Sequence, residues 1–197
     1  MLLFVFLSKA QHTVNGNFDL DRINQKLDSL LLNYNRLEPG VSIGILKDNE
    51  LILEKQHGLA NMEHQIPISP KTSFHVASVS KQFTAFAILL LENEGKLTLD
   101  DNIRKYLPEM HEFEHPISIR NLMNHTSGLK DQYNLLRLSG WTLNDLITND
   151  QVLQILFNQK TLNFQPNEKF MYSNSGYTLL AEIVSRVSNM SFSNFMD

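Results

Sequence analysis

Ser78 and Lys81 stand three residues apart at the start of a strongly apolar segment. In a helix this spacing places both side chains on one face, one turn apart. A serine hydroxyl is a poor nucleophile at neutral pH unless a base lies beside it, and a desolvated lysine can be that base or relay the proton. The helix N-terminus would also favour a developing oxyanion. The pattern predicts a nucleophile at Ser78 with Lys81 as its proton partner; the competing interpretation is a helix cap beside a solvated lysine.

The same spacing occurs a second time, from Ser127 to Lys130. This match lies in a turn that contains Gly128, and no apolar helix follows it. We therefore expect no nucleophile at Ser127, because the helical setting that would activate it is missing.

Tyr172 and Asn174 form the only Tyr-x-Asn triplet in the chain. A polarised phenol can shuttle a proton, and a side-chain amide can hold a substrate amide as both donor and acceptor. Taken alone, a partly buried tyrosine beside a helix-capping asparagine is the simpler interpretation. In combination with Ser78 and Lys81, the triplet favours a catalytic site.

Three segments in this order resemble the motifs of the penicillin-recognising serine hydrolases, which include class C β-lactamases, D-alanyl-D-alanine carboxypeptidases, D-amino-acid peptidases and related esterases. The segments read Ser-Val-Ser-Lys-Gln-Phe-Thr-Ala over 78–85, Leu-Met-Asn-His-Thr-Ser-Gly-Leu over 122–129 and Tyr-Ser-Asn-Ser-Gly-Tyr over 172–177. The resemblance extends from about Gly40 to the last residue. It implies an α/β (α+β) fold of the β-lactamase/transpeptidase type, with an antiparallel sheet flanked by helices and a further helical region.

The resemblance also implies a role for each residue of these motifs. Ser78 would be the acylated nucleophile, and Lys81 and Tyr172 would move the protons as a coupled pair. Asn174 would bind a substrate amide, and His125 would support the site without taking part in catalysis. The substrates would be β-lactams, D-amino-acid peptides of the peptidoglycan kind, or esters. No metal or organic cofactor is implied.

The chain departs from the family pattern after Tyr172. A Lys-Thr-Gly or His-x-Gly triplet, which in the family lines the opposite wall of the site, does not follow; Lys160-Thr161-Leu162 precedes Tyr172 and lacks the glycine. We therefore expect residues 19–197 to be the N-terminal portion of a longer hydrolase domain whose later strands are missing, with little activity on its own. A non-catalytic sensor or pseudoenzyme on the same scaffold is the alternative.

A third hypothesis is that the protein is a zinc peptidase. The stretch from His111 and Glu112 to His115 formally matches the zinc-peptidase pattern His-Glu-x-x-His, which needs a regular helix to bring both imidazoles onto one face. Pro108 and Pro116 leave room for little more than one helical turn. A solvated surface loop is the expected structure.

Several elements must position these residues. Helices are expected over 19–35, capped by Asp19, and over 79–94, ended by Gly95. A β-hairpin is expected from the alternation over 41–45, the polar turn 47–50 and the strand that begins at 51. Further helices are expected over 100–106, 118–124, 143–157 and 178–187. The helix over 79–94 is apolar on most sides and is expected to be buried.

The composition of the chain argues against several classes of partner and of chemistry. The 197 residues carry a net charge of −4, which disfavours nucleic-acid binding, and the chain has no cysteine for disulfides, thiolate zinc sites or thiol catalysis. Residues 1–10 resemble the end of a signal peptide, so we expect a periplasmic or secreted protein that meets a membrane only through this segment. The oligomeric state stays open.

Overall fold

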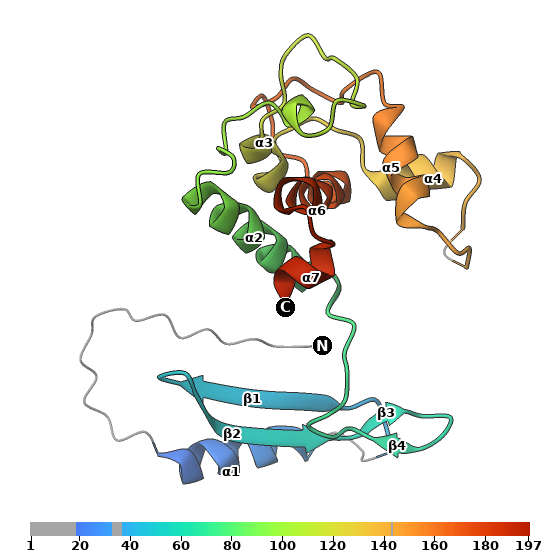
Figure 1. Cartoon of the computed structure of the whole chain (residues 1–197). Coiled ribbons are helices and arrows are strands. Elements are labelled where there is room, and N and C mark those ends of the chain that lie inside the picture. Colours follow the sequence, from blue (N-terminus) through green and yellow to red (C-terminus); the bar gives the residue numbers. More distant parts are fainter. Residues whose placement is uncertain (1–18, 33–36, 143) are drawn as a thin grey trace. The chain divides into compact units, whose positions relative to one another are not determined.

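The computed structural model describes residues 19–32, 37–142 and 144–197, and the expected signal segment over 1–10 lies outside them. The chain divides into two compact units, one up to Val76 and one from Ala77 to Asp197 (Figure 1). Each unit is described by itself. None of the helices in the described part of the chain has the length and apolar character needed to cross a bilayer.

The first unit contains the predicted hairpin. Strands β1 (Val41–Lys47) and β2 (Glu50–His57) pair in antiparallel fashion, and helix α1 (Leu20–Leu31) contacts β2 (Figure 1). The carboxylate of Asp19 accepts a hydrogen bond from the Arg22 N–H at 2.9 Å, which confirms the predicted cap of α1. A second short pair follows, β3 (Leu59–Asn61) and β4 (Ile66–Pro67).

The second unit is helical and holds all the residues of the predicted site. Its helices are α2 (Lys81–Asn93), α3 (Ile119–Met123), α4 (Gln132–Leu138), α5 (Asn149–Phe157), α6 (Asn174–Ser188) and α7 (Phe192–Met196). Two 3₁₀ turns, η1 (Ala77–Ser80) and η2 (Ile103–Lys105), complete it. Helix α6 contacts each of the other five helices and is the centre of the unit (Figure 1).

Helix α6 is central because its sequence is apolar on a wide face. The following residues of α6 are fully buried: Leu179, Leu180, Ile183 and Val184. Ile88 and Leu91 of α2 and Leu122 of α3 belong to the same core. Burying side chains of this size contributes about 1.5–3 kcal/mol each relative to leaving them exposed, so α6 fixes the positions of the helices around it.

Several predicted helix boundaries were wrong, and local capping explains one of them. The helix expected over 143–157 begins only at Asn149, because Thr148 and Gln151 form a capping box there. The helix expected over 178–187 begins earlier, at Asn174. The segment 100–106 forms only the short η2 turn, and helices α4 and α7 were not predicted. The helix expected over 118–124 is confirmed as α3.

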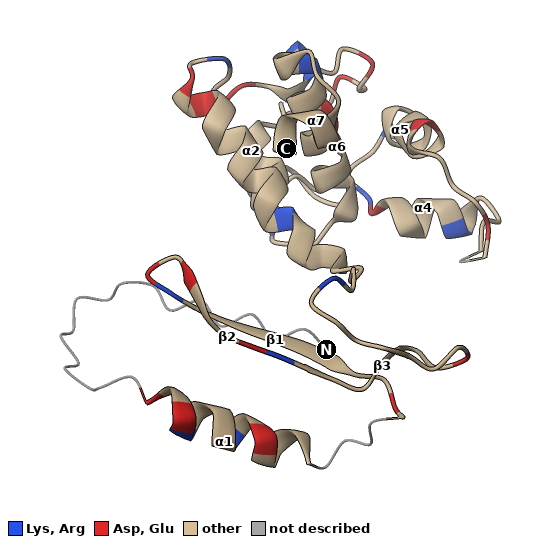
Figure 2. Cartoon of the chain, turned by 60° about the horizontal axis from the view of Figure 1, so that its bottom comes forward, with Lys and Arg blue, Asp and Glu red and all other residues tan. Residues whose placement is uncertain are grey.

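The prediction that the helix over 79–94 is buried is confirmed for one face of the helix and wrong for the other. Helix α2 packs against α6 with its buried residues, which are Thr84, Ala87, Ile88 and Leu91. On its other side Phe83 and Phe86 are 52% and 56% exposed. Figure 2 shows α2 as a largely uncharged helix. A single packed neighbour covers only one stripe of a helix, so an all-round apolar sequence does not by itself ensure burial.

Candidate active site

The predicted nucleophile lies in the η1 turn, one turn before α2 begins at Lys81. The residue before it, Ala77, has a left-handed backbone with φ of +46°, which is uncommon for a residue with a side chain. Such a conformation costs of the order of 1–3 kcal/mol and is found preferentially at functional sites. Ser78 itself is exposed. The chain therefore turns sharply just before an accessible serine.

All four residues of the predicted site lie together. The Lys81 ammonium donates to Ser78 Oγ at 3.2 Å and to Asn174 Oδ1 at 2.9 Å. The Tyr172 hydroxyl donates to Ser78 Oγ at 2.8 Å. Ser78 Oγ thus lies within hydrogen-bond distance of two groups, an amine and a phenol, that can each take a proton when deprotonated.

The environment of Tyr172 lowers the pKa of its phenol. Burial raises the pKa of the phenol, but the nearby Lys81 ammonium and the hydrogen bond with Ser78 lower it by more, so the net pKa lies below the usual 10. The Lys81 Nζ atom lies 4.9 Å from the centre of the Tyr172 ring. A phenol with a lowered pKa accepts and returns a proton more readily near neutral pH.

His125 holds the segment that carries Tyr172. Its Nδ1 accepts a hydrogen bond from the Ser173 N–H at 3.2 Å, and its backbone oxygen accepts one from the Met171 N–H at 2.9 Å. Its ring centre lies 4.6 Å from that of Tyr172. Burial and the charge of Lys81 lower the pKa of His125, which favours the neutral ring that can accept from Ser173. His125 therefore supports the site from the residues on both sides of Tyr172.

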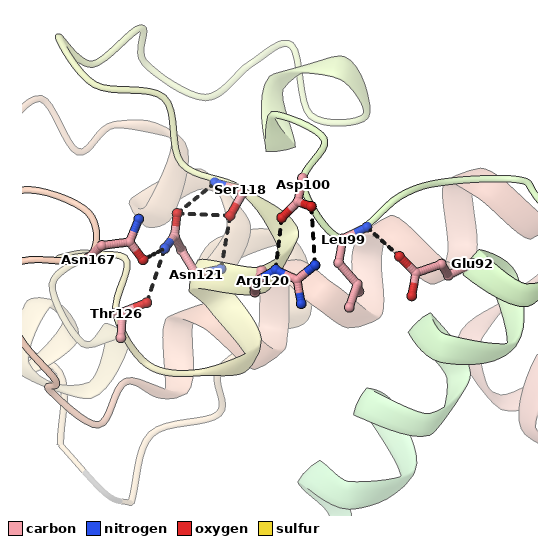
Figure 3. A network of polar contacts seen from close by, with 8 residues as sticks. All are labelled: Glu92, Leu99, Asp100, Ser118, Arg120, Asn121, Thr126 and Asn167. Atoms are coloured by element: carbon pink, nitrogen blue, oxygen red, sulfur yellow. Dashed lines mark hydrogen bonds and ion pairs between the residues drawn. The ribbon is translucent and has the colours of Figure 1, made fainter.

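A buried asparagine, Asn121, connects three segments of the helical unit (Figure 3). Asn121 Nδ2 donates to Thr126 Oγ1 at 3.1 Å and to Asn167 Oδ1 at 2.6 Å. Its Oδ1 accepts from the backbone and the hydroxyl of Ser118 at 3.0 and 2.9 Å. These bonds join the start of α3 to the turn after His125 and to the turn that precedes Tyr172.

The turn after His125 also depends on a glycine. Gly128 has a φ of +74°, and a Cβ built on it would lie 2.0 Å from the Phe164 carbonyl oxygen. The Asn163 N–H donates to the Gly128 oxygen at 2.8 Å. Only glycine combines this backbone conformation with so close a contact.

The competing motifs lack the geometry that their proposed chemistry would need. Ser127 of the second Ser-x-x-Lys spacing is 2% exposed, and the Lys130 ammonium is bonded to Thr161. The segment from His111 to His115 is not helical, as its flanking prolines predicted. Among the residues that the structure describes, no group of three or more His, Cys, Asp or Glu side chains could hold a metal ion.

Asp131 also contacts the site, although no motif in the sequence predicted it. Its Oδ2 accepts hydrogen bonds from the backbone N–H of Asn174 at 2.7 Å and from Asn174 Nδ2 at 2.9 Å. Its Oδ1 caps α4 by accepting from the Tyr133 N–H at 3.0 Å. An aspartate at the start of a helical pattern was the available signal for the cap, but no local pattern links Asp131 to Asn174.

The arrangement of helices and short antiparallel sheets is a β-lactamase/transpeptidase-like fold. The family model described as Beta-lactamase matches residues 27–197, and the chain belongs to this family.

Individual relatives agree with this assignment. Penicillin-binding protein 4* of Bacillus subtilis (strain 168) is 36% identical over 148 residues, which cover 75% of this chain and 32% of that protein. The octameric penicillin-binding protein homologue from Pyrococcus abyssi superposes with a TM-score of 0.72 at 28% identity, over 90% of this chain and 41% of that one. The D-amino acid amidase from Ochrobactrum anthropi SV3 superposes with a TM-score of 0.70 at 25% identity, over 89% of this chain and 47% of the amidase. The chain spans about a third of the length of the curated relatives that it matches.

Proposed function

We propose that this chain carries a serine acyl-transfer site in which Ser78 is the nucleophile. The observation that carries the proposal is the position of Ser78 Oγ, 2.8 Å from the Tyr172 hydroxyl and 3.2 Å from Lys81 Nζ. The substrate classes proposed are β-lactams, D-amino-acid peptides and esters. The names of the relatives, which include penicillin-binding proteins and a D-amino acid amidase, support these classes.

In the proposed reaction the coupled pair of Tyr172 and Lys81 starts with one proton fewer than a phenol beside an ammonium, and the proton of Ser78 passes to this pair as Oγ attacks the carbonyl carbon. The carbonyl oxygen takes the negative charge in the tetrahedral intermediate. When that intermediate collapses, the bond to the leaving group breaks and the pair returns the proton to the leaving group. Water then attacks the acyl-serine with the same pair as base, which releases the acid and restores the Ser78 hydroxyl.

Asn174 retains capacity for a substrate amide. Its Oδ1 accepts from Lys81, and one hydrogen of Nδ2 is donated to Asp131. A side-chain amide has two donor hydrogens and two acceptor lone pairs. One donor hydrogen and one acceptor lone pair of Asn174 are therefore left, and on this basis we propose that Asn174 also binds the amide of a substrate.

A non-catalytic penicillin-binding sensor is the alternative function on this scaffold. Labelling of Ser78 without turnover would support the sensor, whereas labelling followed by turnover would support the hydrolase.

The test is covalent labelling with a fluorescent penicillin and with a fluorophosphonate, together with turnover of nitrocefin and p-nitrophenyl esters. The wild-type chain should be labelled on Ser78, and Ser78→Ala should abolish labelling. Ser80→Ala is the matched control, because Ser80 lies in the same turn and its side chain makes no capping bond. Absence of labelling by both probes in a folded wild-type chain would overturn the proposal.

We also propose that the protein is exported. The proposal rests on the apolar run Met1–Leu7 followed by Ser8 and Ala10, the small residues expected before a signal-peptidase cut. N-terminal sequencing of protein recovered outside the cytoplasm should find a start after Ala10. Recovery of the protein in the cytoplasm with Met1 still at its N-terminus would contradict export.

A further inference from the structure

The Asp131 carboxylate joins two helices that both border the candidate site. Oδ1 caps α4, whereas Oδ2 accepts two hydrogen bonds from Asn174, the first residue of α6. Asp131 is half-buried between them. One carboxylate therefore holds the start of α4 and the start of α6 together.

This contact determines which way the Asn174 amide faces. A carboxylate oxygen only accepts hydrogen bonds, so the amide must turn its NH₂ group toward Asp131. Its oxygen is then directed to the Lys81 ammonium, which only donates, at 2.9 Å. A flipped amide would place oxygen against the Asp131 carboxylate and NH₂ against the Lys81 ammonium, and both contacts would be unfavourable.

We propose that Asp131 is a positioning residue for acyl transfer, because it fixes the Asn174 amide and thereby holds the Lys81 ammonium beside Ser78. The link runs through three contacts: Asp131 to Asn174 at 2.7 and 2.9 Å, Asn174 to Lys81 at 2.9 Å, and Lys81 to Ser78 at 3.2 Å. The effect on acylation rests on the proposed function. The contact between Asp131 and Asn174 is testable without any reaction.

Two substitutions separate the cap from the contact with Asn174. Serine is about as good an N-cap as aspartate, so Asp131→Ser retains the α4 cap while its shorter, uncharged side chain releases the Asn174 amide. Asp131→Ala removes both. Thr148→Ala is the matched control, because it removes the N-cap of α5 and touches none of the site residues.

The contact itself is tested by ¹⁵N NMR of the side-chain amide of Asn174, assigned by its disappearance in Asn174→Ala. In Asp131→Ser and Asp131→Ala we expect the two amide hydrogens to move toward the shifts and exchange rates of exposed asparagines. In Thr148→Ala they should stay as in the wild type. Unchanged Asn174 signals in both Asp131 variants would overturn the inference.

The role in acylation is tested by the kinetics of fluorophosphonate labelling, separated into probe affinity and the first-order rate of bond formation. We expect both Asp131 variants to lower the first-order rate about tenfold, within the coupling usual for residues in contact, although only Asp131→Ala also loses the cap of α4. Probe affinity should change little. The double variant Asp131→Ser/Asn174→Ala should label no more slowly than Asn174→Ala alone.

The outcomes distinguish this inference from the proposed function. Wild-type rates in Asp131→Ser, or rate losses that multiply in the double variant, would overturn the positioning role while leaving Ser78 as the nucleophile. Slowing in Asp131→Ala alone would assign Asp131 to the α4 cap only. If the wild-type chain is not labelled at all, the proposed function fails and the positioning role fails with it, whereas the NMR result still decides whether Asp131 orients Asn174.

Discussion

The hydroxyl of Tyr172 lies 2.8 Å from the hydroxyl of Ser78, although 94 residues separate them in the chain. Tyr172 comes from the segment just before α6, and Ser78 from the turn just before α2. Because α2 and α6 pack against each other, the starts of both helices are held in one place. The packing of the helical unit therefore creates the candidate site.

Removing the Tyr172 hydroxyl should slow acylation with little loss of stability. Tyr172→Phe keeps the ring beside His125 but deletes the proton-transfer group, so labelling of Ser78 should fall about 10²–10⁴-fold. The labelling rate and the melting temperature are the measurements. Tyr133→Phe, at an exposed tyrosine on α4, is the control and should label normally. A Tyr172→Phe variant that labels at the wild-type rate would remove Tyr172 from the mechanism.

Replacing Lys81 should affect both Ser78 and Tyr172. In Lys81→Met the labelling rate should fall about 10²-fold or more, because Ser78 loses a proton partner. The pKa of Tyr172 should rise, because the ammonium that lowers it is gone. A spectrophotometric tyrosine titration, with Tyr172→Phe as the reference, measures this change. A Tyr172 titration that is the same with and without Lys81 would contradict the described electrostatics.

His125 should make the helical unit sensitive to acid. Its pKa is lowered below 6.5 in the folded chain, first by burial and then by Lys81, so the folded state binds fewer protons than the unfolded state. The free energy of unfolding should therefore be fully retained above pH 6.5 and should decrease as the pH falls from there toward the folded-state pKa.

Urea unfolding at several pH values between 5 and 7.5 measures this dependence. His125→Asn, which tolerates the φ of +58° at this position, should show a shallower decrease than the wild type. Since the chain holds six other histidines, the difference between the two slopes is the quantity that matters. Equal slopes would show that His125 contributes nothing to the acid sensitivity.

Gly128 should tolerate no side chain. Gly128→Ala places a methyl group against the Phe164 carbonyl and strains a φ of +74°, so both stability and Ser78 labelling should decrease. Gly140→Ala is a matched control, since Gly140 also has a positive φ, of +89°, but no atom lies within 4 Å of the added Cβ. The control should lose only the strain of about 1–2 kcal/mol. Equal losses in urea unfolding would show that the contact with Phe164 is unimportant.

The sequence by itself determined the features that depend on short-range geometry. At the start of the helix that the apolar residues after Ser78 predict, the Ser-x-x-Lys spacing sets Ser78 and Lys81 one turn apart. The alternation of β1 and the polar turn after it specify the hairpin, and Asp19 specifies the start of α1. The prolines around His111 exclude the helix that zinc ligation would need.

Only the tertiary structure decided which distant residues meet at the candidate site. The contacts of Asp131 with Asn174 and of His125 with Ser173 join positions more than 40 residues apart, and no local periodicity encodes them. The exposure of the phenylalanines of α2 was also decided by the tertiary structure, because the burial of a helix face depends on which other elements pack against it and not only on its own composition. Local spacing places Lys81 beside Ser78. The packing of α2 and α6 around a shared core places Tyr172 and Asn174 beside the same serine and lysine.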